Sequence, residues 1–185
     1  IAELDALHVE KKPAEIYGLT KDASSAEELW RRARACVDLS ELDERERYVR
    51  EGLAAASEAV AVDSTNGYAQ KWLGICLGLV GDYEPVKTKI ANSAKIKRAL
   101  DYADEALPDD ATVSLALGQW SLKLAGLGFV ERKIAGAFFG EPPNASYEDA
   151  LFYFQKSNDL KRSSRTEALI KLANKKLLKK KKVSR

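Results

Sequence analysis

The sequence predicts an all-α protein built from antiparallel helix pairs, and three observations lead to this fold. Apolar residues recur at helical spacing along most of the 185 residues. Short links rich in polar residues or glycine separate these periodic segments. One helix pattern also returns, because Leu117 and Gly118 stand in their segment as Leu73 and Gly74 stand in theirs. A chain of this length with 45% hydrophobic residues can bury one core, so we expect a single domain over residues 1–185.

The first expected helix pair covers residues 24–64, after an N-terminal extension formed by residues 1–23. Its first helix, in "SSAEELWRRARACVDL", begins with a capping box made by Ser24 with Glu27 or by Ser25 with Glu28. After a short polar link, a second apolar stripe follows and ends near the breakers of "DSTNG". Two helices joined by so short a link are expected to pack as a hairpin.

The second pair, residues 66–110, contains glycines inside an apolar run, "NGYAQKWLGICLGLVGDYEPV". We expect one helix over 67–80 and a longer one from Tyr83 to Leu107, with Pro85 in its first turn. Glycine in a helix interior costs about 1 kcal/mol relative to alanine, so Gly74 and Gly78 need compensation. We expect Gly74, like Gly118, to lie where two helices cross closely and only a small residue fits.

The third pair covers residues 111–160, and a fourth pair begins at Ser164. Its two helices are expected in "DDATVSLALGQWSLKLAG" and "SYEDALFYFQKSNDL". Between them stands an insertion, "AGLGFVERKIAGAFFGEPPN". The expected architecture therefore has an elongated helix in its second pair and an insertion in its third.

These segments resemble a tetratricopeptide repeat. The stretch "WLGICLGLVGDYE" is similar to the first helix and turn of that repeat, and "YEDALFYFQKSNDL" is similar to its second helix. The resemblance implies a superhelix of stacked helix pairs, an α-solenoid, whose concave surface binds extended ligands. A general peptide-binding scaffold is one function that this fold would serve.

A closer resemblance is to the regulator of microtubule dynamics proteins. It spans about residues 24–175, and it depends on the long basic helix and on "IAGAFFGEPPNASYEDAL" as well as on the repeats. The family implies a helical-repeat domain that associates with microtubules and spindle poles and influences chromosome segregation. One relative is a membrane-anchored tether between organelles whose repeat domain is said to hold lipid. Cytoplasmic, cytoskeletal and spindle localisation follow from the resemblance as expectations.

The expected long helix carries the main candidate binding site. Between Pro85 and Arg98 the chain has five cations and no acidic residue: Lys87, Lys89, Lys95, Lys97 and Arg98. We expect the interleaved Val86, Ile90 and Ile96 to be buried, which would leave the cations in solvent. They would attract the acidic, flexible tails of tubulin through long-range, salt-sensitive forces. An ordinary solvated face and a site for anionic lipid headgroups are alternatives, whereas nucleic acid is not expected.

The insertion contains a second candidate, Phe138 and Phe139, which stand beside glycines and ahead of two prolines. This pattern suits a short helix that closes over the repeat groove, or an exposed apolar lip. If the lip is exposed, an acyl chain or a partner peptide would fit the groove it borders. Lipid binding or transfer is therefore the alternative function, and native mass spectrometry of the purified protein would detect a retained lipid.

The charge of the chain is unevenly distributed. Residues 161–185 carry 11 basic and 1 acidic side chains, whereas residues 1–65 carry 9 basic and 15 acidic ones. Such a basic block can meet a polyanion. The other interpretation is a solvated or frayed terminus, and the bias of "NKKLLKKKKVSR" does not allow its helical faces to be assigned.

Catalysis and cofactor binding are not expected. His8 is the only histidine and lies before the first pair, so we expect a surface or packing role. The carboxylates Glu41, Asp43, Glu44 and Glu46 alternate with arginines, which is typical of a salt-bridged exposed face. Cys36 and Cys76 lack metal-ligand spacing and are expected to be buried in a reducing compartment. No apolar run reaches the length of a membrane span.

Overall fold

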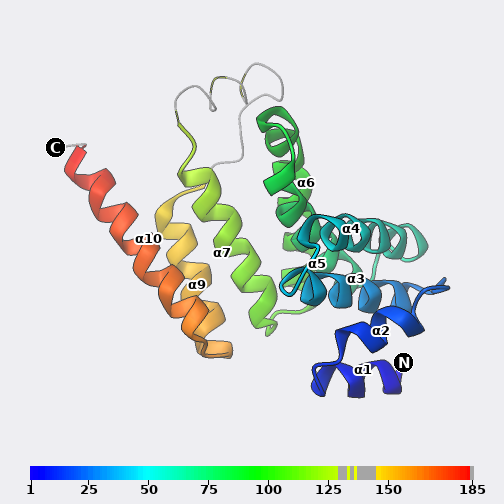
Figure 1. Ribbon diagram of the computed structural model, residues 1–185. Helices are drawn as coiled ribbons and strands as arrows, with labels where there is room; N and C mark the ends of the chain where they lie inside the picture. The colour runs from blue at the N-terminus through cyan, green and yellow to red at the C-terminus, as the bar shows by residue number, and fades with distance from the viewer. Residues whose placement is uncertain (129–132, 134–135, 137–144, 184–185) are drawn as a thin grey trace. The chain divides into compact units, whose positions relative to one another are not determined.

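The computed structural model describes residues 1–128, 133, 136 and 145–183. Within these residues the chain forms helices and no β-strand, which confirms the predicted all-α class (Figure 1). The α-helices are α1 (Ala2–Val9), α2 (Pro13–Leu19), α3 (Ala26–Ser40), α4 (Arg45–Val62), α5 (Gly67–Val80), α6 (Val86–Ala106), α7 (Ala111–Ala125), α9 (Tyr147–Leu160) and α10 (Ser164–Val183). Within each of its two compact units, helices that follow one another in the chain pack together, as in an α-solenoid. The tetratricopeptide-like detail of the packing stays a prediction.

The chain divides into two compact units, Ile1–Pro85 and Val86–Arg185. The division falls between α5 and α6, the two helices of the expected second pair. Each unit is therefore described by itself, and the hairpin expected for α5 and α6 stays a prediction.

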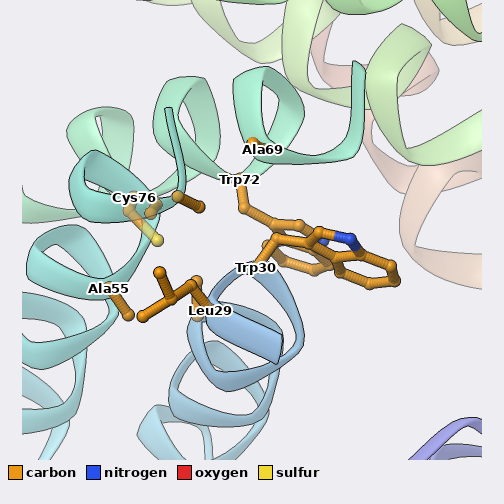
Figure 2. Close-up of a cluster of buried hydrophobic side chains, with 9 residues drawn as sticks. Leu29, Trp30, Ala55, Ala69, Trp72 and Cys76 are labelled. Carbon is orange, nitrogen blue, oxygen red and sulfur yellow. The ribbon is translucent and has the colours of Figure 1, made fainter. Parts of the chain in front are cut away.

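The first unit is built on the predicted pair α3 and α4, against which α5 packs. Ser25 caps α3: its Oγ accepts a hydrogen bond from the Glu28 amide at 3.3 Å, and the Glu28 carboxylate accepts one from the Ser25 amide at 3.4 Å. This capping box is the second of the two that the sequence allowed. The core contains Leu29, Trp30, Ala33, Ala55, Ala56, Ala59, Ala69, Trp72 and Cys76. Figure 2 shows Trp30 of α3 and Trp72 of α5 among the side chains of this core.

Small residues set the distance between helices in the first unit. A Cβ added to Gly52, on α4, would lie 3.1 Å from the Cys36 Cβ and 3.4 Å from the Cys76 Sγ. Both cysteines are free and fully buried, as predicted. Gly52 therefore lets α4 approach α3 and α5 at once, a role that we did not assign from the sequence.

Helices α1 and α2 pack next to α3 through a small apolar cluster of Leu4, Leu7, Ile16 and Ala35. A buried arginine joins α1 to α3. The Arg31 Nε and Nη2 donate to the two carboxylate oxygens of Asp5, at 2.9 and 2.7 Å, and Arg31 Nη1 donates to the Glu27 carboxylate at 2.6 Å. The residues predicted as an extension are thus attached to the first pair.

The second unit contains the predicted third pair, α7 and α9, with α10 packed beside α9 (Figure 1). Gly118 lies where α7 meets α9: an added Cβ would stand 2.5 Å from the Phe154 Cδ1 and 2.6 Å from its Cε1. Phe154 is fully buried. The prediction that Gly118 permits close packing is confirmed.

The two glycines of α5 have different outcomes. Gly74 is buried, but its expected place at a helix crossing stays a prediction. A Cβ at Gly78 would meet no atom within 4 Å, so no close packing accounts for that glycine.

The beginning of α6 differs from the expectation. We predicted a helix start at Tyr83, whereas Gly81–Tyr83 form a 3₁₀ turn, η1, and α6 begins at Val86. Proline disfavours the helical conformation in the residue before it, and Glu84 is accordingly extended, with φ −108° and ψ 150°. Pro85 therefore separates the two elements.

The basic C-terminal block is helical over Ser164–Val183, which contradicts the interpretation of a frayed terminus. Helix α10 packs Leu169, Ile170 and Ala173 into a cluster with Ala150 and Phe154 of α9. These three apolar residues have their partners within the second unit, whereas Leu172 and Leu178 are exposed.

Candidate binding site on helix α6

Helix α6 is long, as predicted: it has 21 residues, whereas α5, α7 and α9 have 14, 15 and 14. Its buried residues include Ile90, Ser93 and Leu100. The Trp120 Nε1 of α7 donates a hydrogen bond to the Ser93 carbonyl oxygen at 2.9 Å. This bond and the apolar contacts fix which side of α6 faces solvent.

Three of the five predicted cations share one side of the helix. At about 100° of rotation per residue, Lys87, Lys95 and Arg98 fall within a sector of about 80°. All three side chains are exposed. Lys95 and Arg98 form no ion pair with any residue that the structure describes. This sector is the part of the candidate site that the structure brings together.

The other two cations lie elsewhere. Lys89 is exposed but points about 200° away from Lys87 around the helix. The Lys97 Nζ donates to both carboxylate oxygens of Asp101 at 2.6 Å and lies 5.6 Å from the centre of the Trp120 ring. The expectation of five solvated cations is therefore wrong for Lys97, because a carboxylate one turn further along neutralises it.

The apolar residues between the cations differ in how deeply they are buried. Ile90 is buried as expected and Ile96 is half-buried. Val86 is 43% exposed, contrary to the expectation, because it is the first residue of α6.

The second candidate site, Phe138 and Phe139, lies outside the described residues. The groove that these side chains would border therefore stays a prediction. The described part of the first unit has a shallow cavity of about 190 Å³, lined in part by Arg32, Glu51 and Glu58. Arg32 and Glu51 lie 3.9 Å apart there. Leu29 and Ala55 also line the cavity, so its wall is part polar and part apolar.

No group of histidine, cysteine and carboxylate side chains that could hold a metal ion occurs among the described residues. The His8 imidazole is half-exposed, with its Nδ1 3.7 Å from a carboxylate oxygen of Asp38. Burial raises the pKa of the Cys36 thiol to about 12 and also raises that of Cys76. Both thiols are therefore protonated at neutral pH, which makes them poor nucleophiles.

Comparison with known proteins identifies the family. The family model described as "Regulator of microtubule dynamics protein 1-3" matches residues 1–184. The chain belongs to the regulator of microtubule dynamics family. The family match extends beyond the predicted span of residues 24–175 and includes α1 and α2.

Individual proteins of this family are also similar to the chain. Regulator of microtubule dynamics protein 1 of Mus musculus is 35% identical over 192 residues, which cover 96% of this chain and 63% of the relative. Regulator of microtubule dynamics protein 1 of Caenorhabditis elegans is 35% identical over 130 residues, which cover 69% of this chain and 58% of the relative. Regulator of microtubule dynamics protein 3 of Xenopus laevis is 31% identical over 136 residues, which cover 71% of this chain and 29% of the relative. The chain thus spans less than two thirds of the length of these relatives.

None of the described helices combines the length and hydropathy that a membrane span requires.

Proposed function

We propose that this chain is a non-enzymatic binding module that associates with microtubules through the cations of α6. The observation that carries the proposal is the sector of Lys87, Lys95 and Arg98, exposed on a helix whose opposite side is fixed by packing. Membership of a family named for microtubule dynamics supports the choice of partner. Roles at spindle poles, in the cytoplasm and in chromosome segregation belong to the same proposal.

The physics of the contact is electrostatic. Acidic tubulin tails are flexible, so they need a concentrated positive surface rather than a shaped pocket. At physiological ionic strength the attraction acts over about 8 Å, the screening length. Binding should therefore weaken steeply as salt is added.

The test is co-sedimentation with microtubules. The variant Lys87→Glu, Lys95→Glu and Arg98→Glu reverses the three exposed charges of this sector and leaves the Lys97–Asp101 pair intact. We expect the bound fraction to fall strongly at physiological salt, while the helical circular dichroism signal stays unchanged. Microtubules stripped of their acidic tails should bind the parent chain as weakly as intact microtubules bind the variant.

The matched control reverses three exposed lysines outside α6, through Lys21→Glu, Lys161→Glu and Lys176→Glu. The control has the same net charge as the α6 variant, so general repulsion from the microtubule lowers both equally. Equal pelleting of the two variants at several salt concentrations would reject α6 as the binding site. Pelleting that does not depend on the acidic tails would reject the electrostatic mechanism.

A further inference from the structure

Helix α10 has a lysine stripe that the microtubule proposal does not use. The helix contains seven lysines and one arginine against a single glutamate. At about 100° per residue, four of these lysines fall within a sector of about 80° and form the α10 stripe: Lys171, Lys175, Lys179 and Lys182. All four are exposed, and they extend over 11 residue steps, about 16 Å at 1.5 Å per residue.

The four lysines of the α10 stripe form no ion pair with any residue that the structure describes. The one acidic residue of the helix, Glu167, accepts a hydrogen bond from the Arg162 Nε at 2.7 Å. Four ammonium groups on one side of a helix repel one another, so an anionic partner would relieve that repulsion.

The packing of α10 excludes one mode of binding to an anionic partner, the insertion of this helix into a membrane surface. A helix that lies in a lipid interface needs a continuous apolar face for the acyl region. The apolar face of α10, with Leu169, Ile170 and Ala173, is already packed against α9. The exposed leucines, Leu172 and Leu178, lie on opposite edges of the α10 stripe, each about 20° beyond it, so they do not form a second apolar face.

Nucleic acid is a poorer match than a peptide. Proteins that bind single strands place aromatic side chains where bases can stack, and α10 contains no aromatic residue. An acidic peptide needs only spaced cations and tolerates two flanking leucines, on which the apolar parts of its side chains can pack.

We propose that the α10 stripe is a docking surface for an acidic, unstructured peptide segment. An extended chain advances about 3.3 Å per residue, so five to six residues are enough to run along the α10 stripe. The proposal concerns another helix than the microtubule proposal, and either can fail without the other.

The experiment measures binding of a fluorescein-labelled octaglutamate peptide by fluorescence anisotropy. All proteins are the full chain with Lys87→Gln, Lys95→Gln and Arg98→Gln, so that the cation sector of α6 does not contribute. One variant removes two charges inside the α10 stripe, Lys175→Gln and Lys179→Gln. Its matched control removes two exposed charges of the same helix outside the α10 stripe, Lys176→Gln and Lys181→Gln. Helicity is checked by circular dichroism.

We expect the variant inside the α10 stripe to bind about fivefold more weakly, the effect of losing two exposed ion pairs. The control should change the affinity by less than about twofold. Equal weakening in both variants would overturn the proposal, because it would show attraction to net charge alone. Absence of binding to the starting protein at physiological salt would overturn it too.

Two competitors decide the class of partner. Octathymidylate and vesicles of phosphatidylcholine with phosphatidylserine are each added at matched anionic charge. We expect octaglutamate to resist displacement by both. Preferential binding of the oligonucleotide or of the vesicles, lost in the variant inside the α10 stripe and kept in the control, would replace the peptide proposal with that partner.

Discussion

Two helical glycines show that close packing requires glycine at one position and not at another. A Cβ at Gly118 would stand 2.5 Å from the Phe154 ring, closer than any real contact, whereas a Cβ at Gly78 would meet nothing within 4 Å. The sequence indicated the role of Gly118 because a Leu-Gly pair recurs there. No such signal marks Gly52, which is followed by a run of alanines. Its role in close packing is evident only from its neighbours on α3 and α5.

Alanine substitution at Gly118 and at Gly78 should change the free energy of unfolding in opposite directions. Gly118→Ala should lower the free energy of unfolding by about 1–3 kcal/mol, because a fully buried ring must shift. Gly78→Ala should raise it by up to about 1 kcal/mol, through better helix propensity without a clash. Urea unfolding followed by circular dichroism measures both changes. Stabilisation by Gly118→Ala would contradict the close contact between α7 and α9.

Asp38 makes the stability of the first unit depend on pH. Burial raises the pKa of its carboxyl from the usual 3.8 to about 6, although the charge of Arg34 opposes this shift. The folded state therefore binds a proton that the unfolded state has already released. The stability that this group contributes is fully present below pH 3.8 and is lost as the pH rises through 6.

Asp38→Asn should accordingly stabilise the protein at pH 7.5 and have little effect at pH 4, because asparagine removes the charge that the folded state disfavours. The urea midpoints of variant and parent at the two pH values measure this difference. Asp22→Asn, at an exposed carboxylate, controls for the loss of one charge. An equal gain at both pH values would show that the ionisation of Asp38 is not the cause.

At the scale of elements, one buried arginine adds a polar connection between α1 and α3 to the apolar contacts of α1. The Arg31 side chain is 7% exposed and binds both carboxylate oxygens of Asp5 as well as Glu27. Its hydrogen bonds hold the pKa of Asp5 below its usual value. Hydrogen bonds to charged partners are stronger than neutral ones, and this fork geometry is specific to arginine.

Arg31→Met keeps the volume of the side chain and removes its hydrogen bonds to α1. We expect a loss of about 1–3 kcal/mol in the free energy of unfolding, with faster amide hydrogen exchange in α1 and unchanged exchange in α4. Arg50→Met is the matched control, because Arg50 also binds two carboxylates, Glu46 and Glu84, but is half-exposed. Its loss should cost less than about 1 kcal/mol. Equal effects would contradict the role of burial.

Element boundaries followed the sequence where local signals were strong. The bounds of α5 match the predicted 67–80, since Asn66 caps its first turn and Gly81 follows it. The start of α6 was misplaced because Pro85 was assigned to its first turn rather than to its boundary. The faces of α10 had no local signal, because lysines occupy nearly every direction around its last turns. Packing against α9 decides them.

The candidate site was only partly predictable for the same reason. The five cations of α6 are evident from the sequence, and the helical rotation of 100° per residue separates Lys89 from the sector of Lys87, Lys95 and Arg98. The sequence did not indicate that Lys97 is paired, because an acidic residue four positions ahead can also point into solvent. Only the observed geometry distinguishes these cases.

At the scale of the whole molecule, the family match covers both compact units of the chain. Within each unit, helices that follow one another pack together, as the repeating pattern predicted. The number of domains and the repeat geometry were not settled by periodicity, because both depend on contacts between helices that lie far apart in the sequence.

The boundary at Pro85 also separates two opposite electrical characters. Residues 1–85 carry 10 basic and 17 acidic side chains, whereas residues 86–185 carry 20 and 11. A polyanion is therefore attracted to the second half of the chain and repelled by the first. Cationic ligands have the opposite preference, so the two halves of the sequence favour ligands of opposite charge.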